Sequence, residues 1–73
     1  MKNTLKPNFP TRLGLGEMIE FTNDNDSVAI WFQKKTNNFC LELNCKVIKA
    51  TKTFSPIAKK MADIGNLKEV VNV

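Results

Sequence analysis

Apolar and polar residues alternate with a period of two through the middle of the chain. The two-residue period is clear in residues 19–22 and 39–43, and it continues less regularly through residues 46–54. In residues 28–32 all positions are apolar, and Val28, Ile30 and Phe32 alternate with Ala29 and Trp31. Because successive side chains of a β-strand point to opposite faces of a sheet, this pattern predicts strands with one buried face and one open face. We therefore expect four strands in the central part of the chain.

The residues between these segments favour an antiparallel meander. Asparagine and aspartate side chains in residues 23–26 can bond their own backbone and tolerate left-handed conformations, which suits a hairpin loop. Residues 34–38 form a second polar loop. Asn44 and Cys45 offer no glycine for a tight turn, so the last two segments are either a hairpin or one long bulged strand.

The period changes after the fourth strand and predicts a short helix at about 56–64. Ser55 is suited to the N-cap and Pro56 to the first helical position, and Gly65 stands where a left-handed C-terminal residue belongs. Three apolar residues fall on one helical face: Ile57, Met61 and Ile64. Residues 66–73 are predicted to form a fifth strand, with a frayed extension of the helix as the alternative.

Pro7 and Pro10 lie in an N-terminal segment, residues 1–16, that lacks the alternation. Each proline biases the residue before it toward extended conformations, so we predict an extended arm followed by one β-rich domain over residues 17–73.

A chain of 73 residues has room for one domain. The predicted fold class is α+β, a small antiparallel β-meander of four or five strands with one short C-terminal helix. A core this small favours self-association as a homodimer.

The charges are unevenly distributed along the chain, although the formal net charge is only +4. Residues 13–32 contain four acidic residues and no basic residue, whereas residues 33–60 contain seven lysines and one acidic residue, Glu42. A basic surface of this kind favours RNA or single-stranded DNA, or an acidic protein surface, as the partner.

The residue inventory argues against catalysis. The chain has no histidine, the commonest general base and metal ligand, and its two cysteines do not supply a four-ligand zinc site. We therefore predict a protein that is not an enzyme and needs no metal or cofactor.

On a strand, Cys40 and Cys45 would lie on opposite faces, so we expect free thiols and a reducing compartment. The N-terminus has no apolar signal segment and no run of 18 apolar residues occurs, so we expect a cytoplasmic protein without a membrane span.

Trp31 is the strongest candidate for a binding residue. It has the opposite parity from the apolar residues of its predicted strand, so its ring either projects from the open face or lies under a cover such as the N-terminal arm or a second subunit. With the ring exposed, we expect Lys49, Thr51 and Thr53 of the fourth strand on the same face. An aromatic ring beside lysines suits single-stranded nucleic acid, because bases stack on the ring and ammonium groups neutralise phosphates. The predicted nucleic-acid contacts are Trp31, Lys34, Lys35, Lys49 and Lys52.

The order of these segments is similar in outline to the carbon storage regulator family of RNA-binding dimers. The comparable pieces are Gly16-Glu17 near the start, the strands VAIWF, NNFCLELN and KVIKATKTF, and the closing helix. The resemblance implies RNA contacts from a threonine-arginine pair on the first strand, for which Thr11-Arg12 would stand, and from a histidine-arginine pair at the end of the last strand. The last strand here has Lys52-Thr53 and no arginine, and the loop lengths differ, so the resemblance supports RNA binding without defining a family.

We therefore expect a non-catalytic regulatory protein that binds RNA or single-stranded DNA through a lysine-rich sheet face and an exposed tryptophan. The alternative is a protein-interaction module, such as a small phage-type inhibitor or adaptor that binds a host protein. Arg12 is the only arginine in the chain, so lysines would provide adhesion with little sequence discrimination.

Overall fold

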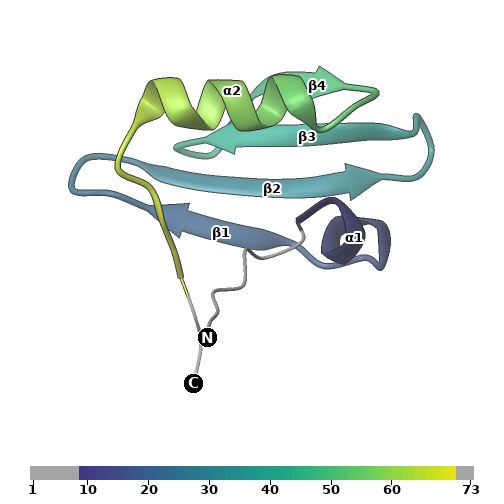
Figure 1. Ribbon diagram of the computed structural model, residues 1–73, viewed down its shortest axis with the longest axis horizontal. Helices are drawn as coiled ribbons and strands as arrows, with labels where there is room; N and C mark the ends of the chain where they lie inside the picture. Colours follow the sequence, from purple (N-terminus) through teal and green to yellow (C-terminus); the bar gives the residue numbers. More distant parts are fainter. Residues whose placement is uncertain (1–8, 71–73) are drawn as a thin grey trace, which may run out of the picture.

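The computed structural model describes residues 9–70, which form a five-stranded sheet and two helices (Figure 1). The strands lie in the order β4-β3-β2-β1-β5, and every neighbouring pair is antiparallel. The elements in chain order are α1 (Phe9–Gly14), β1 (Ile19–Thr22), β2 (Ser27–Gln33), β3 (Asn38–Leu43), β4 (Lys46–Thr51), α2 (Ser55–Ile64) and β5 (Lys68–Glu69). The predicted α+β fold, an antiparallel meander followed by a short C-terminal helix, is therefore confirmed.

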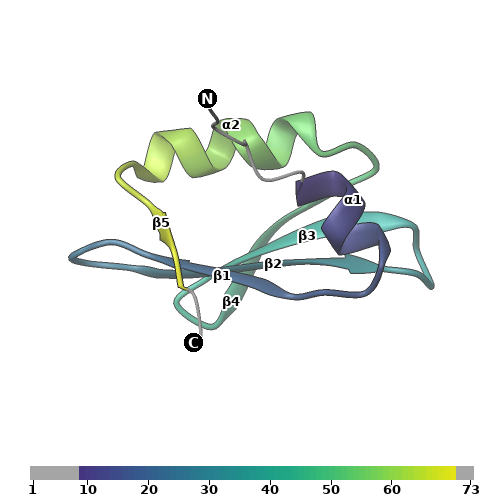
Figure 2. The same cartoon turned by 60° about the horizontal axis from the view of Figure 1, so that its bottom comes forward.

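Both helices lie over the same face of the sheet (Figure 2). Leu13 of α1 and Ile57 of α2 enter one buried cluster with apolar side chains of the central strands, among them Ile19, Ile30 and Leu41. These three strand residues are direct neighbours across the sheet, because Ile30 pairs with both of the others. Burial of this face against the helices supplies most of the apolar contact that stabilises the fold.

The opposite face of the sheet, which we call the open face, has no helix of the described residues packed on it (Figure 2). The strand register assigns its side chains, because residues paired across antiparallel strands point to the same face. The central side chains of the open face are Glu20, Ala29, Trp31, Cys40, Glu42 and Ala50.

The hairpin turns are built around asparagine side chains and left-handed residues. Asn23 Oδ1 accepts hydrogen bonds from the backbone N–H groups of Asn25 (2.8 Å) and Asp26 (2.7 Å), which closes the β1–β2 loop as predicted. Asn44 and Cys45 have φ values of 50° and 71° and form the two-residue connection between β3 and β4. A type I′ hairpin turn requires positive φ at both positions, so β3 and β4 form a hairpin and not one bulged strand.

The expectation of an extended N-terminal arm is wrong for the part that the structure describes. α1 is helical, and Pro10 lies in its first turn, where a missing backbone N–H costs no helical hydrogen bond. Leu13 of this helix is buried, and the Phe9 ring meets the Phe21 ring edge-on with centroids 5.4 Å apart. These contacts anchor the segment to the core as a helix. The rest of the predicted arm, residues 1–8, lies outside the described residues.

The C-terminal elements agree with the prediction except at their boundaries. The N-cap position of α2 is Phe54, which offers no side-chain hydrogen bond, and Ser55, predicted as the cap, is already helical. Gly65 ends the helix with a φ of 85°, as predicted. β4 ends at Thr51, three residues earlier than expected. A fifth strand is confirmed in the tail, although residues 71–73 lie outside the described residues.

Candidate nucleic-acid interface

Trp31 lies on the open face, in the central strand β2. Its partner in β3 is Cys40, whose partner in β4 is Ala50, so these three side chains form one row across the sheet. The flanking residues of β2, Ile30 and Phe32, belong to the helix-covered core. Trp31 is half-buried, so it keeps part of its surface in solvent. The predicted parity of Trp31, opposite to that of the core residues, is therefore observed.

Cys40 is unusually buried for a residue on an uncovered face. Only 5% of its surface is exposed, although no described helix lies over it. The largest side chain beside it on this face is that of Trp31, directly opposite in the ladder. Burial raises the pKa of the Cys40 thiol above its ordinary value. In this row, Cys40 is therefore buried, whereas part of the Trp31 side chain stays exposed to solvent.

Three of the predicted lysines lie at one end of the sheet, close to Trp31. Lys34 and Lys35 are exposed in the loop between β2 and β3, and Lys52 follows the end of β4. Lys52 reaches this loop, where its Nζ donates a hydrogen bond of 2.6 Å to the carbonyl oxygen of Thr36. Only one further row of the open face separates Trp31 from the loop. We call Lys34, Lys35 and Lys52 the basic end.

Lys49 does not join the basic end. It pairs with Leu41 of β3, so it lies on the helix-covered side of the sheet, and Thr51, opposite Phe39, lies there too. The expectation that these residues share the open face is therefore wrong, and the third residue expected there, Thr53, lies beyond the end of β4. A register shift between β3 and β4 changes the parity along β4, which alternation alone does not reveal. Because β4 is an edge strand, polar side chains are tolerated on both of its sides.

An acidic row crosses the open face next to the row of Trp31. Glu20 of β1 lies opposite Ala29 of β2, which lies opposite Glu42 of β3. Both glutamates line a hollow of about 240 Å³ on this face. We did not predict this row, although the alternation assigns each glutamate to the outer face of its own strand. Only the register between the strands brings them together.

The strand order turns the uneven charge of the sequence into a separation across the sheet. The β2–β3 loop, β4 and α2 carry the seven lysines of residues 33–60, whereas the acidic residues of residues 13–32 lie on β1 and the loops that flank it. Within the described part of the chain, the two ion pairs shorter than 4.0 Å both involve Arg12. The lysine ammonium groups in this part of the chain therefore have no carboxylate partner.

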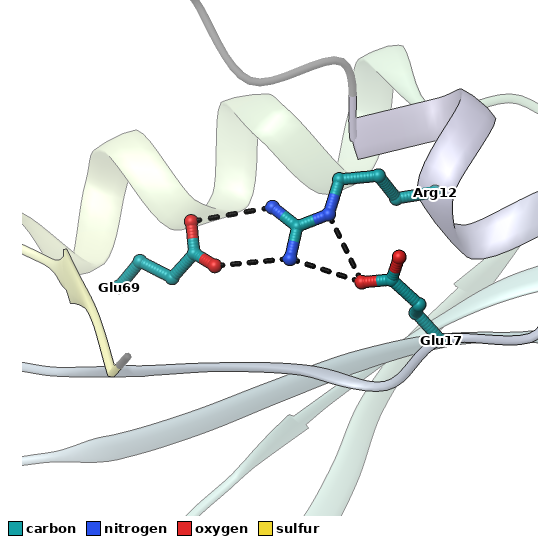
Figure 3. Close-up of polar contacts among 3 residues, drawn as sticks. All are labelled: Arg12, Glu17 and Glu69. Carbon is teal, nitrogen blue, oxygen red and sulfur yellow. Dashed lines mark hydrogen bonds and ion pairs between the residues drawn. The ribbon is translucent and has the colours of Figure 1, made fainter. Parts of the chain in front are cut away.

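Arg12 joins α1 to β5 and to the segment before β1 through two glutamates (Figure 3). Its Nη2 lies 3.1 Å from Glu69 Oε2 and 3.0 Å from Glu17 Oε1, and its Nε donates a 3.0 Å hydrogen bond to the same Glu17 oxygen. The hydrogen bond to Glu69 and, as the next largest contribution, the hydrogen bond to Glu17 raise the pKa of the guanidinium above its ordinary value. Thr11-Arg12 therefore lies on a helix, and it does not match the threonine-arginine pair on a first strand that the family resemblance implies.

No model of a known protein family matches the chain, and no curated protein or solved structure matches it. Neither helix of the described residues is long and apolar enough to cross a membrane. Within the same residues, no three cysteine, aspartate or glutamate side chains are grouped so that they could hold a metal ion. Trp31 and the neighbouring lysines are therefore the features of the described residues that bear most directly on function.

Proposed function

We propose that the protein is a non-catalytic regulator that binds RNA or single-stranded DNA at the basic end of the open face. The observation that carries the proposal is the proximity of a partly exposed Trp31 to three lysines without a carboxylate partner in the described residues. A base would stack on the accessible part of the indole, and the ammonium groups would neutralise the neighbouring phosphates.

The charges of the open face favour one path for the nucleic acid. Glu20 and Glu42 lie on the side of Trp31 away from the basic end, and their carboxylates would repel phosphates. The bound strand would therefore cross the end of the sheet, over the β2–β3 loop and Lys52, and would not follow the β-strands along the whole face.

Discrimination among base sequences would be weak. Arg12, the only arginine, is held by Glu69 of β5, the edge strand opposite β4, and by Glu17 before β1. Lysine is a flexible point charge, whereas bidentate recognition of a base edge requires a planar group such as guanidinium. We expect similar affinities for single strands of different sequence.

Fluorescence anisotropy of end-labelled single strands of RNA and DNA tests the proposal. The three lysines of the basic end, at about 0.7 per phosphate contact, contribute about −2 to the slope of log K against log salt concentration. The double variant Lys34→Gln/Lys35→Gln should lower the magnitude of this slope by about 1.4. The control Lys46→Gln/Lys68→Gln makes the same charge change away from the basic end and should leave the slope unchanged. Unchanged anisotropy with micromolar protein at low salt would refute the proposal.

We also propose that the protein works in the cytoplasm. Cys40 and Cys45 are both free thiols, which is the state that a reducing compartment maintains. The measurement is a thiol count on protein isolated from cells under trapping conditions. Two free thiols per chain are expected, and a disulfide-linked species would contradict this location.

The second candidate function is a protein-interaction module, such as a phage-type inhibitor or adaptor, and the acidic row favours it. Glu20 and Glu42 lie beside apolar side chains on the same uncovered face, where Val47 is 53% and Val70 40% exposed. The matching surface is basic and apolar, and a host protein or a second copy of the chain would supply it.

Light scattering and affinity capture after nuclease treatment distinguish this function from nucleic-acid binding. A dimer mass, or one stoichiometric protein partner that resists nuclease, would favour the interaction module. The substitution Glu42→Lys should then disrupt the complex. Under the nucleic-acid proposal, the same substitution should tighten binding of single strands, because it removes a repulsive charge.

A further inference from the structure

A second group of lysines lies on the helix side of β4. Lys49 of β4 and Lys59 and Lys60 of α2 line a hollow of about 220 Å³, together with Pro56 and Asp63. Among the described residues, Asp63 supplies the only carboxylate that lines it, so these side chains give the hollow an excess of positive charge. None of the three lysines forms an ion pair within the described residues.

Protection of the sheet edge explains only part of this group. Lysines on an edge strand oppose pairing with other chains, which accounts for Lys46, Lys49 and Lys52 of β4 and its continuation. Lys59 and Lys60 lie on α2, where no strand edge needs protection. Like charges gathered in one hollow repel each other, and an anion bound between them would relieve that repulsion.

The hollow is close to the basic end, around the edge of the sheet. Lys49 and Lys52 are three residues apart, so their Cα atoms lie within about 11 Å of each other even on a fully extended chain. Lys49 lies on the helix side of the sheet, and Lys52 reaches the β2–β3 loop at the end of the open face. Together the two groups form a band of lysines that passes over the β4 edge.

We propose that the hollow binds a phosphate group of the same single strand that the basic end binds. This inference rests on the proposed function and extends it, because it assigns the path of the strand. From Trp31 the strand passes Lys52, crosses the β4 edge and reaches Lys49, Lys59 and Lys60. Contacts at the hollow add to those at the basic end, so affinity depends on lysines of α2 that lie on the other side of the sheet from the indole.

The test compares two double variants with equal change of charge. Lys59→Gln/Lys60→Gln removes two ammonium groups at the hollow, and Lys46→Gln/Lys68→Gln removes two elsewhere. Each lost phosphate contact lowers the salt slope by about 0.7, which is about fivefold in affinity between 1 M and 0.1 M salt. Because the hollow holds one phosphate, we expect the Lys59/Lys60 variant to lose about 0.7 in slope and about fivefold in affinity at 0.1 M salt. The control should stay within about twofold of the unsubstituted protein.

The possible results separate this inference from the proposed function. If the Lys59/Lys60 variant behaves like the control while Lys34→Gln/Lys35→Gln weakens binding, the path over the edge is wrong and the basic end stands as the site. Equal losses in all three variants would mean that only net charge matters, which overturns the inference. If the unsubstituted protein binds no strand at low salt, both proposals fail. Far-UV circular dichroism of each variant verifies that the fold is retained.

Discussion

Replacement of Trp31 by leucine is the most direct test of the role of the indole. Trp31 is half-buried on the open face, beside Cys40 and Ala50, and none of the fully buried core residues lies on that face. Leucine retains an apolar side chain over Cys40 but has no ring on which a base can stack. We therefore expect a loss of about 1 kcal/mol or less in the free energy of unfolding, since only part of the side chain is buried.

The expected loss in binding is larger than the loss in stability. Base–aromatic stacking is worth about 1–3 kcal/mol per base, which corresponds to a decrease in affinity of about 5-fold to 160-fold. Trp31→Phe keeps a ring and should lie between the leucine variant and the unsubstituted protein. Because neither variant removes a lysine, the salt slope should stay the same in both. The ring and charge contributions are therefore separable.

Fluorescence anisotropy at one fixed salt concentration measures these affinities, and urea unfolding measures the stability of each variant. In the unsubstituted protein, a bound strand should also protect the indole from quenching by acrylamide. An affinity of the leucine variant within twofold of the original, with no change in quenching, would show that the ring makes no contact. The lysines alone would then account for binding.

Three further predictions concern the fold and its thiols. Leu41→Ala, at a position with 0% exposure, should cost about 2–5 kcal/mol in urea unfolding, and a loss under 1 kcal/mol would contradict its place in the core. At pH 8 iodoacetamide should modify the exposed Cys45 at least about tenfold faster than the buried Cys40. Burial limits access to Cys40 and raises its pKa, so less of its thiolate is present. Equal rates at the two cysteines would be inconsistent with the structure. Gly65→Ala should lower the free energy of unfolding by about 1–2 kcal/mol, because Gly65 has a φ of 85°. Gly14→Ala is the control, since an added Cβ there meets nothing within 4 Å, and it should leave stability in thermal unfolding close to unchanged.

Much of the secondary structure was predictable because its signals are local. The two-residue alternation marks β1, β2 and β3, and the asparagine-rich segments mark the turns between strands. Gly65 marks the end of α2 because a positive φ favours glycine. The N-terminal helix was missed because two prolines outweighed the apolar spacing of Phe9 and Leu13, which becomes decisive only when the core is present to receive them.

The candidate site was predictable only in part. The parity of Trp31 and the positions of Lys34 and Lys35 after β2 follow from the sequence of one strand and its loop. The side of the sheet on which Lys49 lies depends on a register shift between β3 and β4, and the acidic row depends on the register of three strands. Pairing between strands is a long-range property, and one shifted residue reverses the face of every later side chain.

The order of residues was enough to predict a strand-rich meander, a helix near its C-terminal end and an uneven distribution of charge. These features follow from periodicity, turn residues and composition, which act within a few residues of one another. Contacts between distant segments place both helices over one face and join Arg12 to Glu17 and Glu69. They also gather three lysines at the end of the open face and three at the hollow beside α2. Periodicity does not reveal these arrangements, because side-chain burial and strand pairing depend on which distant segments meet, and these contacts form only when the whole chain is folded.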